Sequence, residues 1–200
     1  MILKVCGITS QGDADAAISA GATAIGFNFY AKSPRFLAPE RAALIATPGA
    51  RRVGVFVNEA PWRVREIARI AALDVAQLHG DETPADYPAA LTVWKAARVT
   101  ANFDVSRYDR CPVEALLLDG PADELYGGAG HTFDCGLARA GAAHRIIVAG
   151  GLDASNVARA IALAHPWGVD SCSRIESAPG KKDLKKMTDF LYAAKAAVGA

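Results

Sequence analysis

Eight short apolar segments recur along the chain, and amphipathic segments separate most of them. Each apolar segment has the length of a strand, whereas the segments between them carry the apolar spacing of helices. This alternation is typical of parallel strands joined by crossover helices. The predicted strands span residues 2–6, 24–29, 52–57, 75–79, 92–97, 115–119, 145–150 and 168–173.

Six connecting segments are predicted to be helices, and two others, "NFDVSRYD" and "FDCGLARA", allow at most a short helix each. Eight strands and about eight helices in 200 residues predict a compact (β/α)8 TIM barrel, an α/β fold that forms one domain over residues 1–200. The main alternative, a doubly wound open sheet, normally carries a G-x-G-x-x-G turn that "CGITSQGD" lacks. The predicted helices span residues 13–20, 39–46, 61–73, 83–91, 153–165 and 183–198.

Charge and composition exclude several classes of function. With 22 basic and 21 acidic residues, the net charge of +1 provides no overall field for nucleic acid or an anionic membrane. No apolar stretch approaches the roughly 20 residues of a membrane span, and Lys4 comes too early for a signal-peptide core, so we expect a cytoplasmic protein. Cys6, Cys111, Cys135 and Cys172 show no CxxC spacing and are expected to be free thiols.

Polar residues and glycines follow most of the predicted strands. In a (β/α)8 barrel the chemistry lies at the carboxyl ends of the strands, where eight loops converge. The residues at these ends are therefore candidates for a site. They are Cys6, Asn28, Asn58, Gln77, His79, Arg98, Asp119, Gly150, Gly151 and Ser173.

Asp119 and Cys6 are the strongest candidates for catalysis. "ALLLDG" ends an apolar strand with a carboxylate, at a depth where burial favours the protonated acid. "KVCGIT" places a thiol at the end of the first strand, although a cysteine there can also be a small core residue. Together the two groups form a possible acid and base pair, with a thiolate that takes a proton and a carboxylic acid that gives one.

Anion-binding groups occur in three loops. Arg35 in "YAKSPRF" offers a two-pronged guanidinium grip on a substrate carboxylate, or is merely exposed. Gly150 and Gly151 precede a predicted helix, where backbone amides suit a phosphate. The glycine-rich stretch "YGGAGHTFD" (126–134) is a further candidate cover or phosphate loop.

Two other interpretations carry less weight. His79 with Asp81 and Glu82 fits no common zinc spacing, so we expect no metal site there. Lys95 lies inside the fifth strand and could form a Schiff base, but we favour a role in fixing a neighbouring carboxylate by its charge.

Eight motifs along the whole chain resemble one family, phosphoribosylanthranilate isomerase, the barrel enzyme of tryptophan biosynthesis. Any one of them could arise by chance, but all eight occur in the family's order and at the expected strand ends. They are "KVCGIT", "GFNFYAKSPRF", "VGVFVN", "VAQLHGDE", "LLLDG", "GGAGHTFD", "AGGLDASNV" and "ESAPGKKD".

The resemblance implies an Amadori rearrangement of N-(5-phosphoribosyl)anthranilate to 1-(2-carboxyphenylamino)-1-deoxyribulose 5-phosphate, without a metal or an organic cofactor. It implies that Asp119 protonates the ribose ring oxygen, that Cys6 removes the proton from C2, and that Arg35 holds the anthranilate carboxylate. An acid and a base acting together predict a bell-shaped pH dependence. The expected partner is the small-molecule substrate, with the chain acting as a monomer or a dimer.

The phosphate grip that the resemblance implies falls on the glycine pair and on the turn after the eighth strand. That turn departs from the family's usual D-V-S-S-G-V-E, because Cys172 replaces a serine and Arg174 replaces a glycine in "DSCSRIE". An arginine cannot easily adopt a glycine-only backbone shape, but its guanidinium could add to the phosphate site. The implied substrate-binding residues are Arg35, Gln77, His79, Gly150, Gly151, Asp170, Ser173 and Arg174.

Three alternatives stay open. An aldolase-like sugar-phosphate barrel would act through Lys95, and a non-catalytic phosphosugar-binding barrel would not need Cys6 or Asp119. A broader isomerase that also accepts the related aminoimidazole substrate of histidine biosynthesis is expected to carry paired aspartates at the ends of strands one and five. Cys6 stands at the first of those positions.

Overall fold

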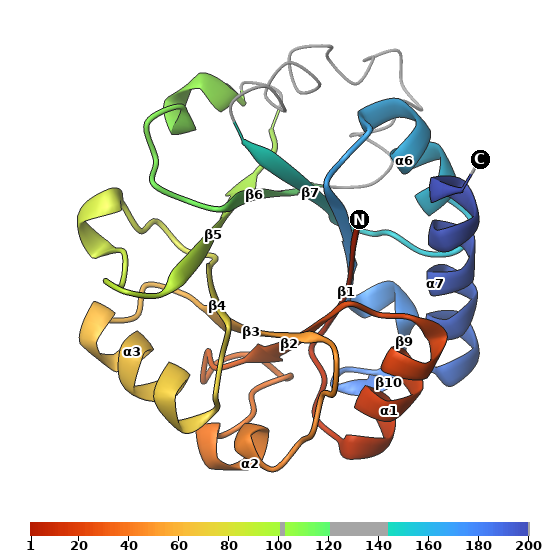
Figure 1. Ribbon diagram of the computed structural model, residues 1–200, viewed down its shortest axis with the longest axis horizontal. Helices are drawn as coiled ribbons and strands as arrows, with labels where there is room; N and C mark the ends of the chain where they lie inside the picture. The colour runs from red at the N-terminus through yellow and green to blue at the C-terminus, as the bar shows by residue number, and fades with distance from the viewer. Residues whose placement is uncertain (101–102, 121–143, 200) are drawn as a thin grey trace.

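Eight parallel strands form a closed barrel in the computed structural model, which describes residues 1–100, 103–120 and 144–199 (Figure 1). Each strand pairs with the next along the chain, and β1 pairs with β8 to close the barrel. The predicted (β/α)8 fold is therefore confirmed. The strands are β1 (Ile2–Cys6), β2 (Ala24–Asn28), β3 (Arg51–Phe56), β4 (Val75–Leu78), β5 (Thr92–Arg98), β6 (Ala115–Asp119), β7 (Arg145–Ala149) and β8 (Gly168–Ser171).

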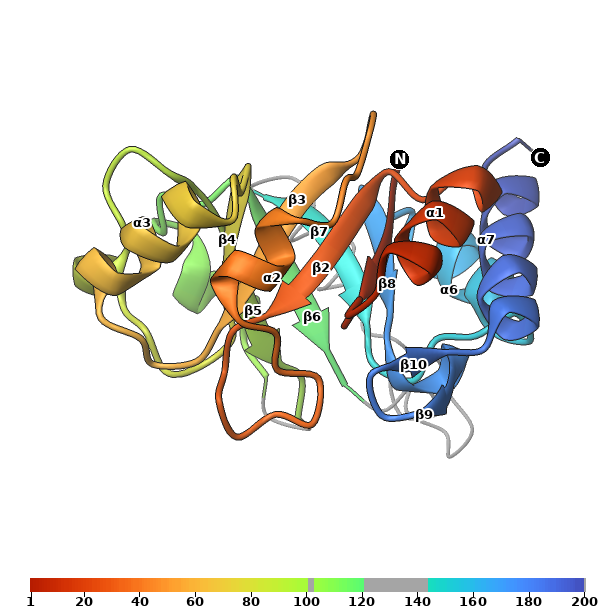
Figure 2. The ribbon, with the colours of Figure 1, turned by 90° about the horizontal axis from the view of Figure 1, so that it is seen from below.

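Helices and short 3-10 turns surround the barrel, with α7 packed against α1 and α6 (Figure 2). A two-stranded hairpin, β9 (Glu176–Ala178) with β10 (Lys181–Lys182), follows β8 at the end of the barrel where the strands finish. No helix in the described ranges combines the length and apolar character needed to cross a membrane. The helices are α1 (Gln11–Ala20), α2 (Pro39–Ala43), α3 (Pro61–Ile70), α6 (Val157–Ala164) and α7 (Leu184–Val198), with 3-10 turns η1 (Pro84–Asp86), η2 (Val105–Tyr108) and η3 (Ser173–Ile175).

The helix predicted over residues 83–91 is wrong, because only η1 forms there. Tyr87 is extended, with φ −75° and ψ 133°, and it precedes Pro88, which disfavours helical backbone in the residue before it. The segment predicted over 153–165 becomes helical only at Val157. Asp153 and Asn156 instead form a turn, in which the Asp153 backbone N–H donates to Asn156 Oδ1. The motifs "FDCGLARA" and "GGAGHTFD" lie outside the described residues.

The barrel has its own interior core, separate from the layer between strands and helices. Alternate residues of each strand face opposite sides, so one set fills the barrel and the other packs against the helices. The interior set is small and apolar on most strands, with Trp94 as its largest member. It comprises Ala24, Val53, Val75, Trp94, Ala96, Ala115, Leu117, Ile147 and Ala149.

A network around Glu114 closes the amino-terminal end of the barrel. Glu114 precedes β6 and accepts a hydrogen bond from the indole N–H of the fully buried Trp94 at 2.7 Å. Arg51 Nη1 lies 2.9 Å from the same carboxylate, and its guanidinium also stacks over Trp94. Arg145 stacks over Trp167, which meets Trp94 edge to face. This end is therefore sealed by paired charges and aromatic rings, which leaves the opposite end for a site.

Glu114→Ala should lower the free energy of unfolding by about 1–3 kcal/mol, because it leaves the buried Trp94 N–H without an acceptor. Urea unfolding followed by tryptophan fluorescence measures the change. Glu66→Ala is the matched control, since Glu66 pairs with Arg63 of the same helix near the surface and the effect of its loss should be within experimental error. Equal stability of the two variants would contradict the proposed seal.

Candidate active site

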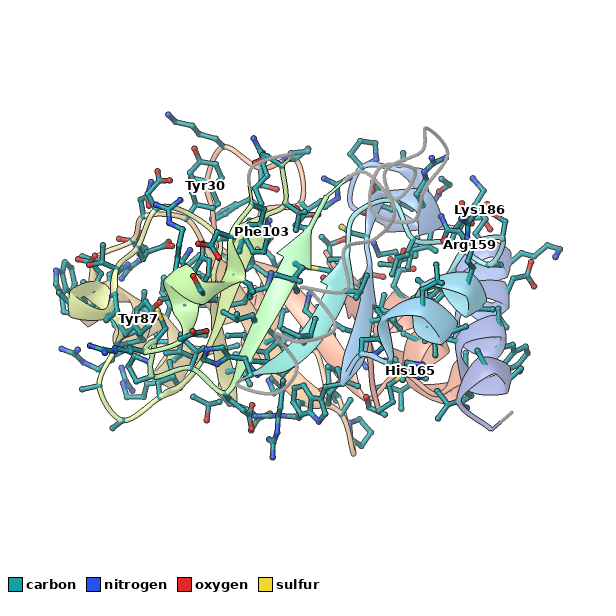
Figure 3. All side chains as sticks on the ribbon, turned by 90° about the horizontal axis from the view of Figure 1, so that it is seen from above. Tyr30, Tyr87, Phe103, Arg159, His165 and Lys186 are labelled. Atoms are coloured by element: carbon teal, nitrogen blue, oxygen red, sulfur yellow. The ribbon has the colours of Figure 1, made fainter. Side chains whose placement is uncertain are left out.

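A cavity of about 300 Å³ opens at the carboxyl ends of the strands. The loop after β2, which carries Tyr30, lies at this end, whereas His165 lies toward the other end (Figure 3). All ten residues that the sequence assigned to catalysis or substrate binding contribute to its wall. The lining comprises Cys6, Asn28, Arg35, Val55, Gln77, His79, Leu117, Asp119, Ala149, Gly150, Gly151, Leu152, Asp170, Ser171, Cys172, Ser173 and Arg174.

Cys6 ends β1 beside a buried ion pair. Lys4 is fully buried and its Nζ donates to Asp170 Oδ2 at 2.9 Å across the β1–β8 pairing. A methyl carbon built on Gly26 would lie 2.9 Å from Cys6 Sγ and 3.1 Å from Lys4 Nζ. The thiol and the ammonium therefore converge on space that Gly26 leaves free. Cys6 itself is only 8% exposed.

The surroundings of Cys6 favour its thiolate. A hydrogen bond from the Cys172 thiol lowers the pKa of Cys6 well below its usual value; burial opposes this shift, and the charge of Lys4 adds to it. The hydrogen bond with Cys6, together with burial, raises the pKa of Cys172, which remains a thiol. Although burial works against a charged ammonium, Asp170 raises the pKa of Lys4 above its usual value. Burial raises the pKa of Asp170 to about 7, with Lys4 limiting the rise.

Asp119 ends β6 and is linked to two residues of the β4 end. His79 Nε2 lies 3.2 Å from Asp119 Oδ2, and the Gln77 amide nitrogen lies 3.2 Å from His79 Nδ1. With the amide in this orientation, Nδ1 accepts from Gln77, and Nε2 is left to donate to Asp119 and orient its carboxylate. The Asp119 side chain is 36% exposed, so the burial expected for this acid is not found.

Two buried oxygens of the cavity wall have no hydrogen-bond partner among the described residues. They are Gln77 Oε1 and Asp170 Oδ1, and both residues are almost fully buried. An unsatisfied buried acceptor costs about 1–3 kcal/mol, which a ligand hydroxyl could recover by donating to it. The cavity is therefore suited to a ligand with several hydroxyl groups.

Arg35 is held by a carboxylate that sequence reasoning did not identify. Its Nε and Nη2 donate to Glu176 Oε1 and Oε2 at 2.7–3.2 Å, and Lys182 Nζ donates to Glu176 Oε1 at 2.9 Å. Burial alone would raise the pKa of Glu176, but these hydrogen bonds hold it below its usual value. The fork of Arg35 expected to grip a substrate carboxylate is thus occupied, and Nη1 lies outside this grip. Glu176 and Lys182 both lie in the segment "ESAPGKKD", but nothing in its sequence predicted the hairpin that brings them together.

Lys95 does not contribute to the described cavity wall. Trp94 and Ala96 on either side of it face the barrel interior, so Lys95 faces the outer layer. Its Nζ donates to Glu82 Oε2 at 3.1 Å and to three backbone carbonyls. The predicted role of this lysine, fixing a carboxylate, is confirmed. Glu82 in turn accepts from the backbone N–H groups of Asn58 and Gly80, which holds the loop after β4.

Within the described ranges, no group of three or more His, Cys, Asp or Glu side chains is arranged to hold a metal ion.

The glycine pair and the turn after β8 form the remaining wall of the cavity. Gly150 has φ 89°, and a Cβ there would lie 1.7 Å from the Gly120 carbonyl oxygen, so a side chain is excluded. Arg174 lies in η3, and it is not among the described residues with positive φ. The turn has therefore adjusted to the arginine, which lines the cavity and is exposed.

The fold and the site define a (β/α)8-barrel enzyme whose polar cavity combines a thiol, a carboxylate and anion-binding groups. A family model for N-(5'-phosphoribosyl)anthranilate (PRA) isomerase matches residues 3–193. The chain belongs to this family.

Relatives agree in sequence and in structure. The chain is 82% identical to an N-(5'-phosphoribosyl)anthranilate isomerase of Solibacter usitatus over 200 residues, 100% of both chains. A phosphoribosyl anthranilate isomerase structure from Thermotoga maritima is 38% identical with a TM-score of 0.86, covering 98% of this chain and 100% of that one. Another isomerase structure, in complex with reduced 1-(o-carboxyphenylamino)-1-deoxyribulose 5-phosphate, is 34% identical with a TM-score of 0.86, covering the same shares.

Lys4→Met should raise the pKa of Cys6, because it removes a buried positive charge that favours the thiolate. Alkylation of Cys6 by iodoacetamide should then need a higher pH than in the wild type. The wild type and Lys4→Met should react at similar rates only at a pH above the Cys6 pKa of each protein. The rate against pH, followed by peptide mass spectrometry, measures the shift. Lys181→Met, which removes an exposed charge from the hairpin, is the control, and an unchanged Cys6 profile in Lys4→Met would rule out the effect.

Proposed function

We propose that Cys6 and Asp119 perform, as base and acid, the isomerase reaction of this family, a step of tryptophan biosynthesis. The observation that supports these roles is that both groups line one cavity, with a pKa lowered at the thiol. No cofactor has a part in the proposal. The substrate is N-(5-phosphoribosyl)anthranilate, and the product is 1-(2-carboxyphenylamino)-1-deoxyribulose 5-phosphate.

The acid acts first in this proposal. Asp119 protonates the ring oxygen of the ribose, the bond between that oxygen and C1 breaks, and the nitrogen lone pair forms a Schiff base at C1. His79 orients the Asp119 carboxylate through its hydrogen bond. Asp119 is half-exposed in the free site, and a substrate that fills the cavity would remove water from it and favour the protonated acid.

The base acts second. The Cys6 thiolate removes the proton from C2 of the Schiff base, and the electrons of that bond neutralise the nitrogen to give an enolamine. The enolamine then becomes the ketone by transfer of a proton from the C2 hydroxyl to C1. Lys4 stabilises the thiolate before the transfer. The unpartnered oxygens of Gln77 and Asp170 would accept hydrogen bonds from sugar hydroxyl groups.

The two anionic ends of the substrate have separate sites in the proposal. The anthranilate carboxylate binds Nη1 of Arg35, because Glu176 occupies the edge of the guanidinium formed by Nε and Nη2. The phosphate lies against the amides of Gly150 and Gly151 and the turn that carries Ser173 and Arg174.

We further propose that the enzyme is cytoplasmic and that one copy of the chain carries a complete site, as a monomer or within a dimer. In support, the lining of the described cavity supplies the acid, the base and the groups proposed for both anions.

Cys6→Ser and Asp119→Asn should each lower turnover by a factor on the order of 10² or more, the contribution of a positioned acid or base. The assay follows the loss of fluorescence of freshly generated phosphoribosylanthranilate in metal-free buffer. Cys111→Ser is the control, because Cys111 lies outside the cavity lining. Near-normal turnover in either site variant would refute the role of that residue.

Arg174→Ala should raise KM about tenfold with little change in kcat, because a lost phosphate contact removes roughly 1.4 kcal/mol of binding common to substrate and transition state. Steady-state kinetics separate the two constants. Arg159→Ala is the control, since Arg159 lies on α6 and is not part of the described cavity lining. An unchanged KM in Arg174→Ala would mean that the side chain only points to solvent.

A further inference from the structure

Cys6 and Cys172 lie side by side at the closure of the barrel. The register pairs Val5 of β1 with Ser171, the last residue of β8, and a cysteine follows each of them. Paired strands lie about 4.8 Å apart, so the chain enters both cysteines from a spacing close to the Cα separations that a disulfide requires. Contact with Cys172 is the largest cause of the lowered pKa of Cys6. A methyl carbon built on Gly7, next to Cys6, would lie only 3.1 Å from Cys172 Sγ.

Access and charge at this pair suit oxidation. Both cysteines line the cavity, so a small polar oxidant can reach them without unfolding of the barrel. Lys4 faces the Cys6 side, whereas Cys172 Sγ lies 4.0 Å both from Lys182 Nζ and from Glu176 Oε1. The positive charge of Lys4 beside Cys6 favours its thiolate, which is the form that reacts with peroxide.

We propose that Cys6 and Cys172 form an oxidation site, where hydrogen peroxide converts the two thiols into a disulfide that blocks the isomerase and that a dithiol reverses. The Cys6 thiolate attacks one peroxide oxygen, the O–O bond breaks, and Cys6 becomes a sulfenic acid with release of hydroxide. Cys172 sulfur then attacks Cys6 sulfur, and the S–O bond breaks. The departing hydroxide takes the Cys172 proton, and the hydroxide from the first step takes the proton that Cys6 lost when it ionised. The two thiols thus lose two electrons and two water molecules form.

The two cysteines have different roles in this step. The pKa of Cys6 is lowered, which makes it the group that meets peroxide, whereas Cys172 remains protonated and resolves the sulfenic acid. Cys172 stands where the resembling family has a serine, so a serine at this position would leave Cys6 without a resolving thiol. Disulfide formation does not depend on the isomerase mechanism, but the loss of activity rests on the role proposed for Cys6.

Peptide mapping tests the pairing directly. Trypsin places Cys6 on residues 5–32, Cys172 on 160–174, and both other cysteines on 111–139. The reduced full-length protein is treated with hydrogen peroxide, alkylated and digested without reductant. We expect a linked pair of 5–32 with 160–174, in the wild type and in Cys111→Ser. Oxidation of Cys6 without this link, or a link from either peptide to 111–139 instead, would overturn the proposal.

Activity is measured in parallel, relative to each protein's own reduced form. Peroxide should lower wild-type turnover by a factor on the order of 10², as expected for loss of a general base, and dithiothreitol should restore it. In Cys172→Ser, prolonged peroxide should carry Cys6 to the sulfinic acid, which dithiothreitol does not reduce. The disulfide therefore protects Cys6 from irreversible oxidation. Equal recovery of activity by the wild type and Cys172→Ser would overturn this role. Formation of the link with full activity would instead refute Cys6 as the base and leave the oxidation site in place.

Discussion

The pairing of β1 with β8 is the constraint on which the site depends. This pairing closes the barrel, and its register places Lys4 opposite Asp170 and ends at Val5 and Ser171, the residues that precede Cys6 and Cys172. Because alternate residues of a strand share a face, Lys4 and Cys6 both point inward. A shift of one residue would turn both side chains toward the helices. Asp170, at 2.9 Å, and the neighbouring Cys6 then hold the charge of the fully buried Lys4. The strand pairing that closes the barrel thus also places the charge of Lys4 that lowers the pKa of Cys6.

A second carboxylate organises the cations on the other side of the thiol pair. Glu176 comes directly after η3 and joins Arg35, from the loop after β2, to Lys182 of the β9–β10 hairpin. It neutralises much of their charge in the free protein while it fixes their positions. An anionic ligand then meets groups that are already ordered, so less conformational entropy is lost on binding. The same hairpin brings Lys182 close to Cys172.

The sequence allowed the fold and the positions of the site residues to be predicted for one physical reason. Parallel strands in a barrel end at the same face, so listing the strand ends already listed Cys6, Gln77, Asp119 and Gly150. The pairings could not be read in this way. Lys4 with Asp170, and Cys6 with Cys172, depend on the register between the first and last strands, which local periodicity does not specify. The helix expected over 83–91 failed because Pro88 acts on Tyr87, a local rule that the apolar pattern concealed.

The acid and the base of the proposed mechanism need opposite surroundings, and the protein's own side chains provide only those of the base. The thiol is buried beside a positive charge, so its reactive form exists before substrate arrives. The carboxyl group of Asp119 is 36% exposed and lies next to His79. His79 therefore orients this carboxyl group, but the protein does not shield it from water. In the proposed mechanism, the substrate would complete the acid by displacing water from the cavity as its sugar and phosphate bind. Binding energy from the distant phosphate would then contribute to chemistry at the ring oxygen.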